Sequence, residues 1–229
     1  MAVSLIIEGV ILGILTGGVY ALMASGLTLI FGVLEIINVA QGILVVLGAY
    51  LTFVLERSLH IDLFVGLLII MPLMFGLGVL LEWAFIRRIK WDRVTLSILV
   101  TYAIALIIEG ALGYFFTTNF VELHSWYIDA TVQIGGFYIQ YIYIFVFLLS
   151  VVLLAGLFLL IYRTAFGRQL RASMQNRTAA SLIGINVPRV QAITFGIGVS
   201  LAGAVCLGLV RFRSNFGTYK DAFSLSRVW

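Results

Sequence analysis

Long runs of apolar residues, separated by short polar connections, dominate the chain. A bilayer core requires about 20 apolar residues of helix, and at least six segments reach or approach that length. We place the spans at roughly 5–32, 41–56, 62–86, 94–116, 139–162 and 190–210. The second span is short, so part of 33–45 is expected to be irregular backbone at membrane depth. Such backbone survives only where protein buries it or where it lines a wet cavity.

Composition agrees with a membrane protein. Hydrophobic residues make up 62% of the 229 residues, charged residues only 10%, and the mean hydropathy is +1.15. Soluble domains average about 25% charged residues. We therefore predict an all-α, polytopic transmembrane bundle that forms one domain over 1–229. The N-terminus has no Lys or Arg before its apolar stretch, so we interpret it as a retained span and not as a signal peptide.

Positive charge predicts the orientation of the spans. Two connections, 87–93 and 163–189, are rich in Arg or Lys and belong on the cytoplasmic side, whereas 117–138 contains no Lys or Arg and belongs outside. After the last span the tail, 211–229, should be external, yet it is basic. Either it is an interfacial segment, or the chain stops short of further spans; we favour the second interpretation.

Several kinds of chemistry have no motif in the sequence. There is no GxxxxGK[ST] phosphate loop, and Gly76-Leu77-Gly78 inside an apolar span is typical of helix packing. His60 and His124 stand in separate predicted loops, and Cys206 is the only cysteine, so we predict no metal site and no disulfide. We expect no cofactor in this chain. The basic residues that give the net charge of +4 lie beside the spans, so they indicate the orientation of the chain in the membrane and not nucleic-acid binding.

Polar side chains within the spans are candidates for a translocation pathway, since an ionisable group at mid-bilayer costs about 2.5–3.5 kcal/mol. Glu35, Asn38 and Gln41 fall in the predicted break between the first two spans, where they could handle a zwitterionic or amide solute or form an ordinary polar turn. Glu109 could pair with another helix or face a pathway. Glu82 is near the cytoplasmic end of its span and is expected to reach Arg87 or Arg88.

The connection at 177–190 predicts a short, sharply bounded helix. On a helix Ala179, Leu182 and Ile183 share one face. Gly184 is suited to the left-handed residue after the helix, and Pro188 to the start of the next one. So short a helix needs a surface to lie against. The residues alone fit docking on another protein and resting on anionic lipid equally well.

Two stretches resemble the branched-chain amino acid ABC transporter permease family, whose relatives also carry urea and short amides. The first, GGVYALMASGLTLIFGVLEIINVAQGILVVLGAY at 17–50, matches its N-terminal signature at Gly18, Tyr20, Ala21, Gly26, Leu27, Gly32, Asn38, Gly42, Gly48, Ala49 and Tyr50. It departs from the family at Glu35, where a basic or neutral residue is usual, and at Gln41, where histidine is usual.

The second stretch, 162–203, resembles the cytoplasmic loop that carries an EAA-type motif. Ala179, Ala180 and Gly184 keep the spacing of that motif, and Thr178 replaces its acidic residue. The resemblance implies that this helix docks into an ATPase subunit, with Arg168 and Arg171 flanking the dock. It also implies further spans after 210, so the chain is expected to be truncated at its C-terminus relative to the family.

The resemblance implies an inner-membrane permease subunit that works with a second permease subunit, two cytoplasmic ATPases that bind ATP and Mg, and an external solute-binding protein. Two rival functions remain. An ion-coupled secondary transporter or channel would use Glu109 as a proton or cation site. An intramembrane enzyme is less favoured, because no nucleophile, base or metal constellation is present in the sequence.

Overall fold

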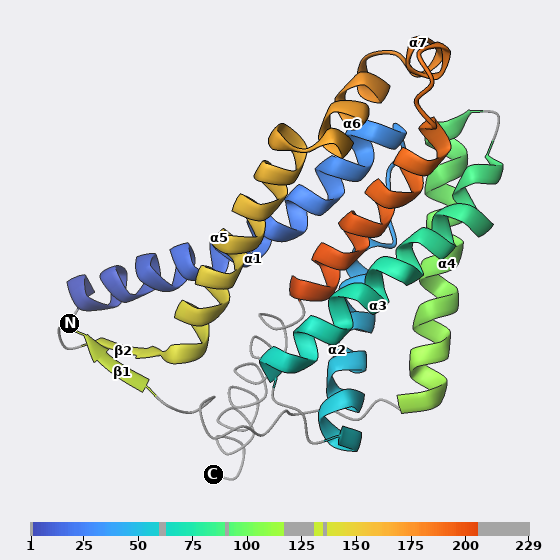
Figure 1. Cartoon of the computed structure of the whole chain (residues 1–229). Helices are drawn as coiled ribbons and strands as arrows, with labels where there is room; N and C mark the ends of the chain where they lie inside the picture. The colour runs from blue at the N-terminus through green and yellow to red at the C-terminus, as the bar shows by residue number, and fades with distance from the viewer. Residues whose placement is uncertain (1, 60–62, 90–91, 117–130, 135–136, 206–229) are drawn as a thin grey trace.

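The computed structural model describes residues 2–59, 63–89, 92–116, 131–134 and 137–205. Five described helices are long and apolar enough to cross a membrane, namely α1 (Ala2–Leu34), α2 (Gln41–Leu59), α3 (Leu63–Ala84), α4 (Arg93–Phe116) and α5 (Tyr141–Arg163). Another helix runs through 187–205, in the place of the sixth predicted span. The predicted polytopic helical bundle is therefore confirmed (Figure 1). The tail at 211–229, His60, His124 and Cys206 lie outside the described residues.

Short elements connect the long helices. A 3-10 turn, η1 (Ile86–Arg88), follows α3, and two further helices, α6 (Ala165–Gln175) and α7 (Arg177–Leu182), follow α5. The part of the predicted external loop that the structure describes forms an antiparallel hairpin of β1 (Thr131–Ile134) and β2 (Phe137–Gln140). We predicted a span from 139 and no strands. Val, Ile, Phe and Tyr favour extended backbone, and the Gly-Gly pair between the strands is typical of a hairpin.

The two basic connections lie at the same end of the bundle, as the charge pattern predicts. Figure 1 shows η1 and the start of α4 at the end where α6 and α7 also lie, while the hairpin is at the opposite end. We call the first of these the basic end, defined by 86–93 and 163–189. The chain thus crosses the bundle in alternating directions between the two ends.

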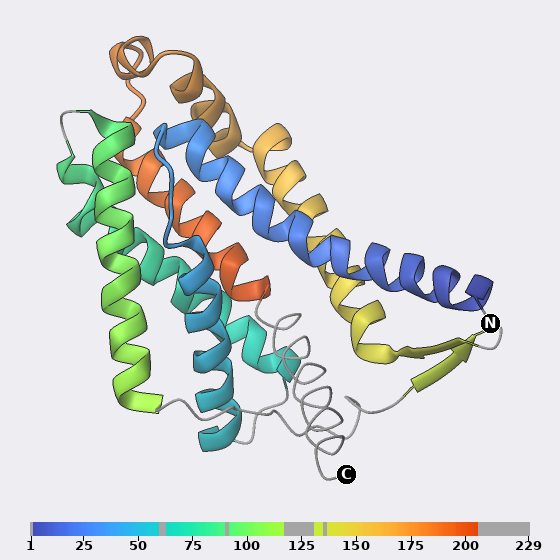
Figure 2. The same ribbon diagram turned by 180° about the vertical axis from the view of Figure 1, so that it is seen from behind.

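The helix over 187–205 forms the centre of the packing. It lies between α1 and α3 in both views, and Phe195 and Val199 are almost fully buried (Figures 1 and 2). Its contact with α3 uses glycine on both sides, since a Cβ atom at Gly78 would lie 2.8 Å from the Cα atom of Gly196. The packing role predicted for this glycine pair is confirmed at Gly78. At Gly76 a Cβ would have no neighbour within 4 Å in the part of the chain that the structure describes.

The outer helices leave broad apolar surfaces exposed. α1 and α5 run side by side, and Gly18 of α1 faces the ring of Phe147 of α5 so closely that a Cβ would lie 2.7 Å from it. The exposed side chains of α1, α4 and α5 include many large apolar residues, such as Ile14, Ile107 and Phe158. Surfaces of this kind are stable against lipid or another membrane protein and not against water.

Candidate functional site: the helix break and the loop at the basic end

The chain leaves the helical conformation between α1 and α2. Residues 35–38 are irregular and 39–40 form a turn, so the predicted irregular backbone is confirmed. α1 ends at Leu34, and the next residue, Glu35, has a φ of 54°, which lies in the left-handed region. The segment 35–40, which we call the helix break, then runs along α4 to the start of α2 (Figure 2).

Two hydroxyl side chains of α4 accept hydrogen bonds from backbone amides of the helix break. The amide of Ile37 donates to Oγ of Ser97 at 3.3 Å, and the amide of Val39 donates to Oγ1 of Thr101 at 3.2 Å. Both hydroxyls are buried and donate in turn to carbonyls of α4, at Val94 and Ser97 respectively. Because an unpaired amide in an apolar interior is costly, these bonds fix the path of the break. We predicted no role for either residue from the sequence, where their i, i+4 spacing in one span is the available signal.

Asn38 and Gln41 belong to one buried network. Nδ2 of Asn38 donates to Oε1 of Gln41 at 3.1 Å, and Nε2 of Gln41 donates to the carbonyl oxygen of Gly198 at 3.2 Å. A Cβ at Gly26 would lie 3.0 Å from the same carbonyl, so α1 and the 187–205 helix meet here backbone to backbone. Oδ1 of Asn38 is buried without a hydrogen-bond partner in the described structure. The network joins the break to α1 and the central helix.

The four predicted pathway residues do not form one cluster. Asn38 and Gln41 meet, but the side chain of Glu35 is 67% exposed and faces the basic end. Glu109 is exposed on α4, seven residues before the helix ends at Phe116, which is about 10 Å along its axis. The structure therefore assigns these two carboxylates to different surfaces.

A tight corner begins the loop at the basic end. Thr164 caps α6 by accepting a hydrogen bond from the amide of Gly167 at 3.0 Å. Gly167 lies directly against the end of α5, and a Cβ there would be 2.0 Å from the carbonyl oxygen of Ile161. Leu170 is buried on the inner face of α6. No larger residue fits at Gly167 without moving one of the two helices.

α7 has the helix ends that the sequence predicts. Oδ1 of Asn176 accepts from the amide of Ala179 at 3.0 Å, which caps the first turn. Gly184 has a φ of 88°, and its amide donates to Ser181, while the amide of Ile185 donates back to Ala180. This pair of bonds is a Schellman motif. The predicted left-handed role of Gly184 is confirmed, and Pro188 stands in the first turn of the next helix.

The predicted apolar face of α7 points away from the rest of the chain. Leu182 is 83% exposed and Ile183 is 75% exposed, and Ala179 and Thr178 are exposed beside them. Ala180, on the opposite side of α7, is buried. We call Thr178, Ala179, Leu182, Ile183 and Gly184 the exposed tip.

The predicted flanking arginines differ in their surroundings. Arg168 is exposed on α6. Arg171 is half-buried; its Nη1 donates to the carbonyl of Ile161 at the end of α5, and its guanidinium lies over the ring of Tyr162. Arg171 therefore stabilises the corner between α5 and α6, since a cation at a helix C-terminus satisfies its last carbonyls.

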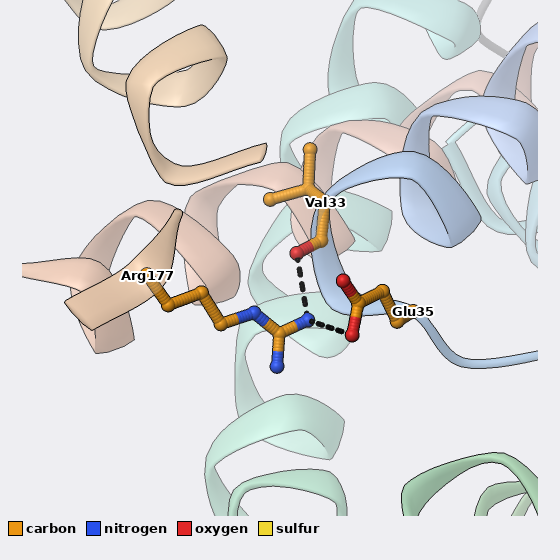
Figure 3. Close-up of polar contacts among 3 residues, drawn as sticks. All are labelled: Val33, Glu35 and Arg177. Carbon is orange, nitrogen blue, oxygen red and sulfur yellow. Dashed lines mark hydrogen bonds and ion pairs between the residues drawn. The ribbon is translucent and has the colours of Figure 1, made fainter. Parts of the chain in front are cut away.

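Arg177, which the sequence analysis did not single out, connects α7 to the end of α1. Its Nη2 donates to the carbonyl oxygen of Val33 at 3.2 Å and lies 3.5 Å from Oε2 of Glu35 (Figure 3). Burial lowers the pKa of the Arg177 guanidinium below its ordinary value, and the Glu35 carboxylate opposes that effect. An exposed ion pair contributes only about 0–1 kcal/mol to stability.

Glu82 does not form the predicted ion pair. It is 1% exposed near the end of α3, and among the described residues neither Arg87 nor Arg88 comes within 4.0 Å of its carboxylate. Arg87 and Arg88 point to the exposed surface of the basic end. Burial of α3 against the central helix at Gly78, one turn earlier, keeps Glu82 on the inner face.

Comparisons with known proteins match nearly the whole chain. The profile of the family described as branched-chain amino acid transport system / permease component matches residues 9–217. A high-affinity branched-chain amino acid transport system permease protein, BraD of Pseudomonas aeruginosa, is 28% identical over 218 residues, covering 86% of this chain and 69% of the relative. The probable permease LivH of Methanocaldococcus jannaschii is 29% identical, covering 91% of this chain and 66% of the relative.

The high-affinity permease LivH of Escherichia coli K12 is 25% identical over 229 residues, covering 90% of this chain and 71% of the relative. No solved structure matches the chain significantly.

Proposed function

Since the chain belongs to the branched-chain amino acid transport system / permease component family, we propose that it is the membrane-spanning permease subunit of an ATP-binding-cassette importer. Its solutes are branched-chain amino acids or related small amides, and it moves them by alternating access in the inner membrane. Partner ATPases bind ATP and Mg and supply the energy. An external solute-binding protein delivers the solute to the end opposite the basic end.

The observation that carries this proposal is the exposed tip of α7. A helix of 6 residues is far below the roughly 12–15 residues at which isolated helices become marginally stable. This one is held by its caps and by Arg177, yet it presents Leu182 and Ile183 to the outside. A rigid apolar tip beside exposed arginines fits a groove on another protein. Resting on lipid is the competing use of such a tip, and the experiments below separate the two.

The same geometry supports transmission of a movement. α6 meets the end of α5 at Gly167 without room for a side chain, and Asn186 caps the 187–205 helix by accepting from the amide of Arg189 at 3.2 Å. A push on α7 by a closing ATPase would therefore act on α5 and on the central helix. Tilting these helices exchanges inward and outward access.

Glu109 supports the second permease subunit as a partner. A charged group costs about 2.5–3.5 kcal/mol at the centre of a membrane helix, and Glu109 lies exposed about 10 Å inside its span, where lipid still disfavours a carboxylate. A Cβ at Gly110 or Gly113 beside it would meet no described residue within 4 Å, so another helix can approach closely. We propose that a donor-bearing helix of the second permease subunit covers this face of α4. A solute path between the two subunits would then pass near Glu109.

The docking proposal is tested by Gly184→Val in the complex with its partners. A β-branched residue at a left-handed φ disfavours the bend that ends α7, so we expect coupled leucine uptake to fall at least about tenfold while ATP hydrolysis and membrane insertion persist. Gly156→Val, on an open face of α5, is the matched control. Unchanged uptake in Gly184→Val would contradict docking.

Three further measurements define the function. Uptake that survives ATP depletion but collapses with the ion gradient would favour an ion-coupled transporter or channel with Glu109 as its cation site. Competition among leucine, isoleucine, valine and urea identifies the solute class. A co-purifying ATPase from native membrane decides the energy source.

A further inference from the structure

Arg177 lies where the loop at the basic end meets the helix break. It is the first residue of α7, and it reaches the end of α1, which is 144 residues earlier in the chain. One nitrogen, Nη2, serves both the carbonyl of Val33 and the carboxylate of Glu35, the residue at which the break begins (Figure 3). The exposed tip and the break are thus joined through one side chain.

The ion pair between Arg177 and Glu35 is the weaker part of this contact, next to the bond to the Val33 carbonyl. The Glu35 side chain is 67% exposed, and exposed ion pairs contribute little to folding. Glu35 also adopts a φ of 54°, which a non-glycine residue takes at a cost. Because the ion pair is weak and Glu35 is strained, the contact can form and break easily. What the contact determines is the position of the chain at the start of the helix break.

The contact has a defined path into the bundle. The residues after Glu35 are fixed on α4 through Ser97 and Thr101, and Asn38 continues to Gln41 and the central helix. A second contact supports the end of α1, because Cε of Met174 of α6 lies 3.0 Å from the position of a Cβ at Gly32. Displacement of α7 therefore pulls on the start of the break.

We propose that Arg177 is a positioning residue that links the exposed tip to the helix break, so that partner movement at α7 shifts residues 35–40. The role of this link in transport rests on the proposed function, whereas the contact itself does not. In the isolated chain it predicts that loss of Arg177 frees the break. In the complex it predicts that loss of Arg177 weakens coupling without weakening docking.

The first test uses the isolated chain and needs no partner. A cysteine at the half-exposed break position, Val39→Cys, is placed in a Cys206→Ser background and labelled with a membrane-permeant maleimide. Arg177→Met should raise the labelling rate about fivefold, the factor that corresponds to losing one weak ion pair. Glu35→Gln keeps the Val33 bond and should give a smaller rise. Arg163→Met, an exposed arginine at the end of α5, should leave the rate unchanged.

The second test uses the full transporter and measures leucine moved per ATP hydrolysed, together with the amount of ATPase that co-purifies. Arg177→Met should lower that ratio severalfold with the same amount of bound ATPase, and Arg177→Lys should restore part of it. If Arg177→Met leaves the labelling rate of the Val39→Cys chain unchanged, the link is overturned, whatever the transport result. Absence of any ATPase on the wild-type chain overturns the proposed function and leaves the labelling result standing.

Discussion

The helix break and the exposed tip of α7 both interrupt the series of long helices. They differ in which side chains they bury: the break buries polar groups, and the tip exposes apolar ones. In the break, backbone amides and the side chains of Asn38 and Gln41 are buried and bonded to α4 and to Gly198. In the tip, polar groups complete the helix ends while Leu182 and Ile183 face outward. Apart from Oδ1 of Asn38, the polar groups named here in the break are bonded within the chain, whereas the tip presents apolar side chains to its surroundings.

Both interruptions also contain a residue in the left-handed region, and the residue type differs. Gly184 adopts it freely, whereas Glu35 adopts it at a cost of roughly 1–2 kcal/mol. The tip thus has a permanent bend, and the break starts from a strained one. Strain of this kind persists only where the surroundings fix it, as Arg177 and the hydroxyls of α4 do here.

The largest predicted effect is at Gly198, where the break meets the central helix. A Cβ there would lie 2.6 Å from side-chain atoms of Ile30, and 3.0 Å from the carbonyl oxygen of Gly26. Gly198→Val should destabilise the chain by about 3 kcal/mol and lower its melting temperature in detergent by roughly 5–10 °C. Gly9→Val, whose position is open, is the control. Equal melting temperatures would mean that the close approach is not needed.

An intermediate effect is expected at Gln41. Gln41→Leu keeps the size of the side chain but leaves Nδ2 of Asn38 without its acceptor and removes the side-chain donor from the carbonyl of Gly198, at a cost of about 1–3 kcal/mol. Thermal unfolding in detergent measures it, with Gln175→Leu at an exposed position of α6 as the reference. If both variants melt alike, the network does not hold the break.

The smallest effect on stability is expected at the tip. Leu182→Ser should change the stability of the isolated chain by no more than about 0.5 kcal/mol, because the side chain is 83% exposed. It should nevertheless reduce the amount of partner ATPase that co-purifies. The same substitution at buried Leu170 should lower the melting temperature. If Leu182→Ser binds as much ATPase as the wild-type chain, the apolar tip is not part of the proposed docking surface.

Local patterns predicted the fold well. Apolar runs located five spans and the helix at 187–205, and the Gly184 and Pro188 positions indicated the end of α7 and the start of the central helix, because helix ends depend on nearby residues. The short second span correctly indicated the break. The hairpin was missed because its strands adjoin a strongly apolar segment that hydropathy alone extends to 139.

The contacts of the site were harder to predict because they join distant segments. Nothing near Glu35 indicates that Arg177 is its partner, and the acceptor for Gln41 is a backbone carbonyl at Gly198, which no side-chain motif reveals. Ser97 and Thr101 look like hydroxyls that bond their own helix, which they also do. Asn38 and Gln41 were selected correctly as neighbours, and Glu35 and Glu109 lie elsewhere.

The glycine contacts of the central helix have a mechanical consequence. At Gly78 with Gly196, and at Gly26 with Gly198, main chains touch with no side chain between them. Side chains can change rotamer and so accommodate a displacement, but two backbones in direct contact cannot adjust in this way. α1, α3 and the 187–205 helix should therefore move as one rigid body near these points, so any tilt of the central helix would carry α1 and α3 with it.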